Sequence, residues 1–247
     1  MKYPVHTIDI NADLGEGAGF DVQLMPLISS CSIACGGHFG TEETMRTAIQ
    51  LAKRHGVKVG AHPSYPDQQN FGRKVIDMTK EELKKSIKHQ LQLFYKVCAS
   101  EEVIVHHIKL HGALYNYAGI DPATANAVWS AIQESQKQVK LYVQHGSVLH
   151  QQTENLCPLV FEAFIDRSYN SNGTLVKRSE PDALIETPEK AWKQLNDMVC
   201  RGVVTTKEGE EISMVASTYC VHGDHPNSVA ILNYIQQRCK NHLIQVI

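Results

Sequence analysis

Short apolar segments, each followed at once by polar residues, alternate along this chain with longer segments of helical periodicity. Apolar runs of about five residues that are rich in β-branched side chains are typical of strands in a parallel sheet, because such strands are covered on both faces. The pattern predicts seven strands, at 6–10, 31–35, 57–61, from 103 to just before Lys109, 139–143, 159–165 and 212–219.

Helices are predicted between these strands. Thr41 is expected to cap a helix that ends at Gly56, and Thr79 with Glu82 forms a capping box for the next. Proline at a first helical position marks two more starts, at Asp121-Pro122 and Thr187-Pro188. Further helices are predicted at 21–29 and 226–239. Strands that alternate with helices indicate a parallel sheet with right-handed crossovers.

Every predicted strand is followed by polar residues at its carboxyl end. In an open sheet only the strands beside the switch point need such residues, whereas a barrel gathers all its strand ends around one mouth. We therefore predict one (β/α) barrel of the TIM type over residues 1–247, with its site at that mouth. The strand-end residues are Asn11, Asp13, His38, His62, Lys109, His111, His145, Glu162, Asp166, Arg167, His222 and Asp224.

The segment 103–116 carries two candidates for chemistry. Lys109 and His111 lie two positions apart, so in an extended backbone their side chains point to the same side. A lysine in solvent and a histidine bonded to a backbone carbonyl are the alternative on this segment alone. Glu162 lies within an apolar strand, where an unpaired charge is costly, so Lys109 or Arg167 is expected as its partner.

A long loop follows His62 and extends to about Asp77. Loops of this length without regular structure are usually functional. We expect this loop to act as a lid that brings Arg73 over a ligand; an arginine in solvent is the alternative.

Composition narrows the function classes. The formal net charge of the 247 residues is −2, with no basic stripe, which argues against binding to nucleic acid or to an anionic membrane. The absence of a long apolar window and of a signal peptide predicts a cytoplasmic protein. Seven unevenly spaced cysteines fit free thiols in a reducing compartment. The glycines at 15–19 do not form a dinucleotide fingerprint.

Two kinds of chemistry remain open for the mouth. Asp13, His38 and His62 are candidates to hold a divalent metal, which would lower the pKa of a bound water to about 7. In the alternative, no metal takes part: a carboxylate and a histidine activate water, while Lys109 stabilises negative charge on a substrate oxygen.

Several long segments are similar to one known family. The chain resembles the LamB/YcsF lactam-utilisation family over nearly its whole length. The matching segments are DINADLGE (9–16), SIACGGHFG (32–40), VGAHPSYPD (59–67), FGRK (71–74), HIKLHGALYN (107–116), EAFIDRSY (162–169), GTLVKRS (173–179) and CVHGDHP (220–226).

The resemblance implies an irregular seven-stranded (β/α) barrel related to the glycoside hydrolase and deacetylase barrels. It implies the role of the A subunit in a prokaryotic 5-oxoprolinase, which hydrolyses 5-oxo-L-proline to L-glutamate with ATP and Mg²⁺ and with partner subunits B and C. The matching motifs imply as site residues Asp13, His38, His62, Lys109, His111, Glu162 and Arg167. From their chemistry we take the first six as catalytic candidates. Candidates for substrate binding are Asn11, Arg73, Asn116, Arg167 and Asp224.

Four positions depart from the family pattern: Ala12, Ser32, Thr41 and Leu110. They are compatible with an altered substrate preference or a less active relative. Two other functions therefore stay open. One is a metal-dependent amidohydrolase or carbohydrate deacetylase that acts alone, and the other is a lactam-binding regulatory subunit without chemistry of its own. The chain contains no G-x-x-x-x-G-K-[ST] loop, so ATP is expected to bind by another arrangement or on a partner.

Overall fold

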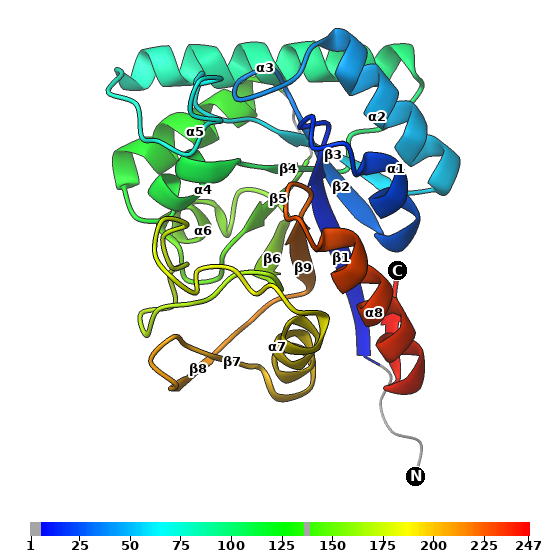
Figure 1. Ribbon diagram of the computed structural model, residues 1–247. Helices are drawn as coiled ribbons and strands as arrows, with labels where there is room; N and C mark the ends of the chain where they lie inside the picture. The colour runs from blue at the N-terminus through cyan, green and yellow to red at the C-terminus, as the bar shows by residue number, and fades with distance from the viewer. Residues whose placement is uncertain (1–5, 136–138) are drawn as a thin grey trace.

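Seven parallel strands close into a barrel in the computed structural model, which describes residues 6–135 and 139–247 (Figure 1). Each strand pairs with the next, and the last pairs with the first, so the sheet has no open edge within the barrel. This confirms the predicted irregular barrel. The strands are β1 (His6–Leu14), β2 (Ser30–Ala34), β3 (Lys58–His62), β4 (His107–Lys109), β5 (Lys140–Val143), β6 (Leu159–Phe164) and β9 (Thr218–His222).

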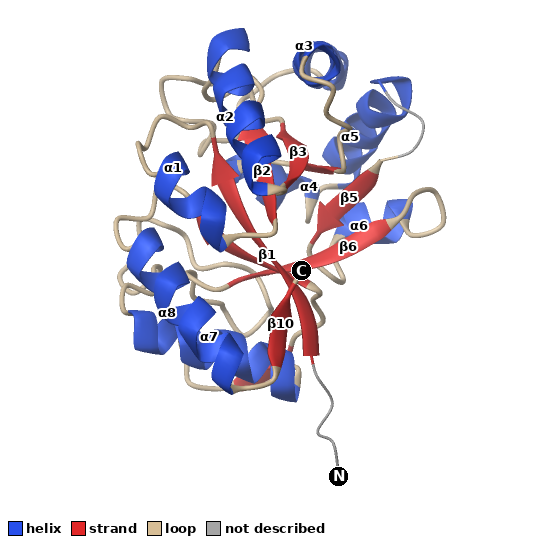
Figure 2. Ribbon diagram, turned by 90° about the vertical axis from the view of Figure 1, so that its right-hand side faces the viewer, coloured by secondary structure: helices blue, strands red, loops and turns tan. Residues whose placement is uncertain are grey.

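Helices surround the barrel on its outer side (Figure 2). Thr41 and Thr79 each accept a backbone hydrogen bond in a capping box, and Gly56 ends its helix at φ 68°, as the sequence predicts. The helical segments are α1 (Asp21–Leu24), η1 (Met25–Leu27), α2 (Glu42–His55), α3 (Lys80–Ser100), α4 (Gly112–Ala118), α5 (Pro122–Ser135), α6 (Val148–Thr153), α7 (Pro188–Arg201) and α8 (Ser228–Asn241).

Side chains alternate along β1 between two environments. Ile10 and Ala12 are buried in the apolar core that includes the surrounding helices. Asn11 and Asp13 lie inside the barrel, where the Asn11 amide donates a hydrogen bond of 2.8 Å to the hydroxyl of Thr218. Because successive strand residues point to opposite faces, one strand supplies both the apolar packing and the polar interior.

The structure differs from the predicted elements in three strands. Strand β1 continues to Leu14, four residues beyond its predicted end, so Asn11 and Asp13 lie within it. The apolar run at 212–219 is divided: β8 (Glu211–Ser213) pairs antiparallel with β7 (Val203–Thr205), and the chain enters β9 only at Thr218. The fourth strand begins at His107, four residues later than predicted. Helices α4 and α6 and strand β10 (Ile244–Val246) were not predicted, and α1 with η1 replaces the longer helix expected at 21–29.

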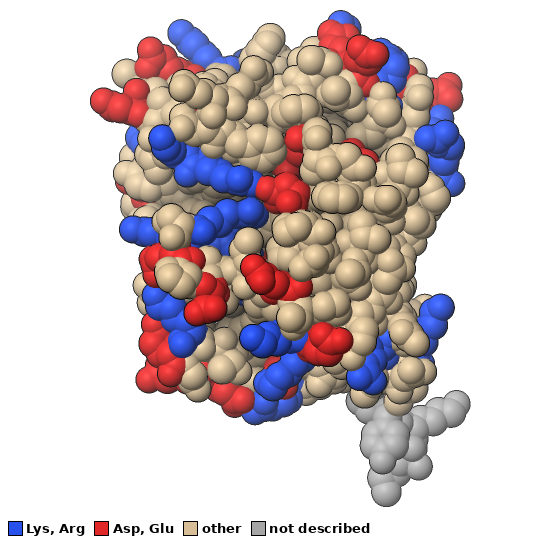
Figure 3. Space-filling model, in the orientation of Figure 1, with Lys and Arg blue, Asp and Glu red and all other residues tan. Residues whose placement is uncertain are grey.

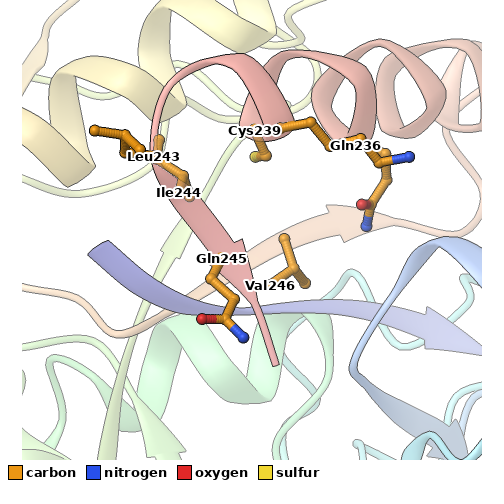
Figure 4. A pocket seen from close by; sticks show the side chains of 7 residues that line it. Gln236, Cys239, Leu243, Ile244, Gln245 and Val246 are labelled. Carbon is orange, nitrogen blue, oxygen red and sulfur yellow. The ribbon is translucent and has the colours of Figure 1, made fainter. Parts of the chain in front are cut away.

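Strand β10 extends the sheet beside the first residues of β1, pairing His6 with Ile244. A shallow hollow lies between β10 and the last turns of α8 (Figure 4). It is at the amino end of β1 and thus at the end of the barrel away from the predicted site. None of the described helices is both long and apolar enough to cross a membrane.

Candidate active site

A lysine and two carboxylates form the centre of the barrel interior. The Lys109 ammonium lies 2.8 Å from Asp13 Oδ1 and 2.7 Å from Glu162 Oε1. These three residues come from β4, β1 and β6, and each is at most 3% exposed. The expected pairing of Glu162 with Lys109 is confirmed, because the lysine supplies the charge that makes a buried carboxylate tolerable.

The two carboxyl groups around Lys109 have opposite pKa shifts. Burial disfavours the ionised form of Asp13, but the charges of His62 and Lys109 outweigh it and hold the pKa of this carboxyl well below its usual range. Burial dominates at Glu162 and raises the pKa of its carboxyl, although Lys109 opposes the rise. For Lys109 itself, the carboxylates outweigh burial and raise the pKa of the ammonium.

Asn11 and Cys220 complete the surroundings of Lys109. The ammonium donates to Asn11 Oδ1 at 3.0 Å and approaches the Cys220 sulfur at 3.1 Å. The Asn11 amide nitrogen in turn donates to Glu162 Oε1 at 3.0 Å. Asn11, predicted to bind substrate, therefore positions both the lysine and the glutamate.

A second group lies next to the first and contains one carboxylate with three imidazoles. Glu16 Oε1 is 2.8 Å from His38 Nε2 and 3.2 Å from His111 Nδ1. His111 Nδ1 is also 3.0 Å from His62 Nε2, and His38 stacks on His111 with ring centroids 3.6 Å apart. All four residues are at most 6% exposed.

Backbone carbonyls fix the orientation of two of these imidazoles. His62 Nδ1 donates to the carbonyl of Lys109 at 2.8 Å, and His111 Nε2 donates to that of Phe71 at 3.0 Å. Phe71 has φ 55° and Gly72 has φ 62°, a region that non-glycine residues rarely adopt. A Cβ on Gly72 would approach the Cβ of His38 to 2.9 Å, so glycine allows this loop to pack closely on the group.

The residues of this second group, Glu16 and its neighbouring imidazoles, also have shifted pKa values. Burial acts against the ionised form of Glu16, but the imidazoles of His111 and His38 outweigh it and hold its pKa well below the usual range. Burial lowers the imidazole pKa of His38 to about 4. At His62 burial is outweighed by the carboxylates, chiefly Asp13, which raise the pKa of the imidazole.

The predicted metal candidates do not form the most compact set of ligands. Within residues 6–135 and 139–247, the structure brings together a single group of three, Glu16, His62 and His111, whose ligand atoms lie within 4.8 Å of one another. His62 is common to both sets. Asp13 instead forms an ion pair with Lys109, and His38 bonds to Glu16 Oε1. In the sequence Glu16 is only a polar residue of a glycine-rich turn, and its position three residues after Asp13 is the available signal.

Three other strand-end residues have supporting contacts. Asp166 accepts hydrogen bonds from the backbone and the imidazole of His222, at 2.9 and 3.0 Å. Arg167 donates to the carbonyls of Val176 and Ala183, at 2.5 and 3.2 Å, so it holds the loop after β6. Burial and the nearby charge of an arginine lower the pKa of Arg167 to about 10.

The loops over the mouth meet through an ion pair. Arg73, from the loop after β3, contacts the carboxylate of Asp224, from the loop after β9, and Arg178 lies 3.5 Å from the same oxygen. In Figure 3, basic side chains extend from the left to an acidic patch near the centre, where Figure 1 draws the loop between β9 and α8. Asn116 and His145 are exposed, and in the described chain neither side chain bonds to the buried groups.

The four departures from the family pattern have structural places. Ala12 and Leu110 are buried in the apolar core, although Leu110 stands between Lys109 and His111 in the sequence. Ser32 lies 3.2 Å from the ring of His107 inside the barrel, and Thr41 caps α2. Within the described residues, none of the four side chains hydrogen-bonds to the carboxylates of the two groups.

Comparison with known proteins identifies the family to which this barrel belongs. Residues 8–247 match the model of the LamB/YcsF family. The chain belongs to this family. A relative from Symbiobacterium thermophilum, named as the A subunit of 5-oxoprolinase, is 41% identical over 244 residues, which cover 96% of this chain and 93% of the relative. One from Haemophilus influenzae (strain PittEE) with the same name is 37% identical, covering 96% and 97%.

Solved structures confirm the fold of this family member. A lactam utilization protein from Thermus thermophilus superposes with a TM-score of 0.90 at 35% identity, covering 97% of this chain and 98% of that one. A family 4 carbohydrate esterase from Streptomyces lividans and a GH18 chitinase from Pseudoalteromonas aurantia share the fold alone. The esterase has a TM-score of 0.50 at 8% identity and covers 98% of this chain and 91% of its own. The chitinase has a TM-score of 0.54 at 10% identity and covers 93% of this chain and 99% of its own.

Proposed function

We propose that this chain is the A subunit of an ATP-dependent 5-oxoprolinase, which hydrolyses 5-oxo-L-proline to L-glutamate together with partner subunits B and C. The observation that carries the proposal is the buried Asp13–Lys109–Glu162 group, which places a cation between two carboxyl groups of opposite pKa shift. It occurs in a chain 41% identical to a protein named as the A subunit of 5-oxoprolinase.

The two carboxyl groups are suited to different steps of amide hydrolysis. Environments that move two pKa values apart commonly separate a general base from a general acid. Asp13, held ionised, takes a proton from the attacking water, and Glu162, whose protonated form is favoured, gives a proton to the ring nitrogen as the carbon–nitrogen bond breaks. Lys109 stabilises the negative charge that develops on the lactam oxygen.

ATP, as its Mg²⁺ complex, supplies the driving force, because a five-membered lactam is an unstrained amide. Transfer of the terminal phosphoryl group to the lactam oxygen, with release of ADP, makes the ring carbon a better electrophile. One water then opens the ring, and a second releases phosphate and leaves L-glutamate. Lys109 is placed to balance the charge of the phosphorylated oxygen. The subunit that binds ATP is not assigned by this chain's motifs.

Substrate reaches the buried groups when the loops over the mouth separate. Arg73 and Asp224 hold these loops together, and Arg73 then becomes free to pair with the carboxylate of 5-oxoproline. Arg167 acts by holding the loop after β6, since two of its N–H groups bond to backbone carbonyls. The unpaired state of all seven cysteines supports the reducing cytoplasm as the compartment.

Turnover of 5-oxo-L-proline tests the proposal. The chain alone, and the chain reconstituted with subunits B and C, are assayed for glutamate with and without Mg-ATP. We expect glutamate only from the full set with ATP. Hydrolysis by the chain alone without ATP would contradict the proposal and favour an independent amidohydrolase. Unchanged turnover by a complex with Asp13→Asn would instead favour a lactam-binding subunit.

A further inference from the structure

We propose that Glu16, His62 and His111 bind one divalent transition-metal ion, of the class to which Zn²⁺ belongs. This goes beyond the proposed function, which gives the chain a lactam substrate but no bound metal ion of its own. Three features of the site support it: the positions of the ring protons, the distances between the donor atoms and the groups behind those atoms.

The ring protons leave two bare nitrogens facing each other. A carbonyl oxygen can only accept a hydrogen bond, so His62 Nδ1 and His111 Nε2 must carry protons where they meet the carbonyls of Lys109 and Phe71. In the neutral imidazoles the remaining nitrogens, His62 Nε2 and His111 Nδ1, therefore have lone pairs, and they lie 3.0 Å apart. Two lone pairs at this distance repel each other unless a proton or a metal ion lies between or beside them.

The distances fit a metal ion. Glu16 Oε1 is 3.2 Å from His111 Nδ1 and 3.7 Å from His62 Nε2, and the two nitrogens are 3.0 Å apart. In a tetrahedral site with ligands at about 2.0–2.1 Å, neighbouring donor atoms are about 3.3–3.4 Å apart. Of the three observed donor–donor distances, two are shorter than this value and one is longer. Two histidines and a glutamate with a fourth position free are the donor set of many catalytic zinc sites.

The hydrogen-bond partners of the three proposed ligands are also those expected at a metal site. Histidine ligands almost always donate their second N–H to a carbonyl or carboxylate, and ligating carboxylates are themselves hydrogen-bonded. Both histidines do so here, and Glu16 Oε1 is 2.8 Å from His38 Nε2. Asp13 Oδ2, 3.4 Å from His62 Nε2, lies next to the proposed ion on the side of Lys109.

Metal binding by the isolated, chelator-treated chain tests this proposal without ATP, lactam or partner subunits, so its outcome is separate from that of the turnover assay. Zn²⁺ is titrated by calorimetry and counted by elemental analysis, and Co²⁺ is added to record visible absorption. We expect one ion per chain and the intense Co²⁺ absorption of a four-coordinate site with nitrogen ligands.

Glu16→Gln and His111→Gln each remove one ligand with little change in side-chain size. We expect each to weaken Zn²⁺ affinity by more than about tenfold, because loss of a group that merely orients a ligand already costs about 10–100-fold. His89→Gln, which alters an exposed histidine on α3, is the matched control and should bind as the unaltered chain does. Circular dichroism verifies the folding of each variant without metal.

Two results would overturn the proposal. One is an unaltered chain that binds no Zn²⁺ and gives only the weak Co²⁺ absorption of the hydrated ion, which would mean that a proton shared by His62 and His111 fills the place of the cation. The other is binding that persists at full affinity in both folded variants. If either variant fails to fold, the Co²⁺ spectrum and the stoichiometry of the unaltered chain decide the question.

Discussion

Two adjoining groups in this barrel balance buried charge in different ways. In the first, Lys109 is a covalently attached cation between Asp13 and Glu162. In the second, Glu16 is surrounded by imidazoles, which supply positive charge only when a proton or another cation is added. His62 joins the two, since it donates to the backbone of Lys109 and approaches Asp13.

The difference separates a permanent charge from an exchangeable one. A lysine between carboxylates keeps its charge over the whole physiological pH range, because the carboxylates raise its pKa. An imidazole cluster gains or loses its cation with pH and with the supply of metal ions. The first group is therefore suited to stabilising charge in a reaction, and the second to binding a ligand that the solution supplies.

Removing the permanent cation is expected to have the largest effect. Lys109→Met should lower kcat/KM in the reconstituted complex by about 10³-fold, because a buried donor to the developing charge is lost. It should also lower the free energy of unfolding by about 3–5 kcal/mol, because two carboxyl groups remain buried without a counter-charge. Kinetics and urea denaturation measure the two effects. The exposed Lys85→Met is the control, and substantial turnover by Lys109→Met would refute the role.

Removing the acid beside that cation should have the next largest effect. Glu162→Gln is expected to lower kcat about 10²-fold through loss of general acid catalysis. Burial raises the pKa of Glu162, so activity that needs its protonated form falls as pH rises through that pKa. The variant should lack this alkaline fall, whereas the acid side, governed by the lowered pKa of Asp13, should be retained. A full pH–rate profile measures both limbs, and an unchanged alkaline limb would argue against Glu162 as the acid.

A carboxylate outside both groups provides a comparison for stability. Asp166→Asn should cost about 1–3 kcal/mol of unfolding free energy at neutral pH, because the charge-assisted bonds to His222 are lost. The imidazole and backbone of His222 outweigh burial and depress the pKa of Asp166, so this stabilisation is present above the unfolded-state pKa of about 3.9 and is lost as pH falls below it. Denaturation at several pH values should therefore give converging stabilities in acid; a constant difference would contradict the assignment.

The loop contact over the mouth should have the smallest effect on stability. Arg73→Ala should change the free energy of unfolding by about 0–1 kcal/mol, because the Arg73–Asp224 pair is partly exposed. It should raise KM for 5-oxoproline by about threefold to tenfold, because a carboxylate partner is lost. Steady-state kinetics measure this, with Arg54→Ala on α2 as control. An unchanged KM would leave Arg73 a loop contact only.

Much of the fold could be predicted because strand ends carry local signals. Lys109, His111 and Asp166 stand at abrupt changes from apolar to polar sequence, and these changes indicate where a parallel strand stops. The run at 212–219 shows the limit of this reasoning. Apolar periodicity does not reveal that its first residues pair with β7 and its last with β1, since partner choice depends on residues far along the chain.

The site was harder to predict than the fold. His62 and His111 meet only because the barrel places β3 beside β4, and their proton positions depend on backbone carbonyls that no motif specifies. Glu16 follows β1 in a turn where side-chain direction is not set by strand alternation. Arg167 looked like a ligand-binding cation, but its bonds to the loop carbonyls are visible only in three dimensions.

The pairing of β10 with the first residues of β1 determines how the protein is best attached to a surface. β10 ends at Val246 beside Ile8, and the mouth lies at the other end of the same strand, roughly 20 Å away by the rise of an extended chain. A biotin or affinity tag joined to the carboxyl terminus would therefore orient immobilised molecules with the mouth toward solution. Sensor measurements made in this geometry would leave the loops that carry Arg73 and Asp224 accessible to small molecules and to other proteins.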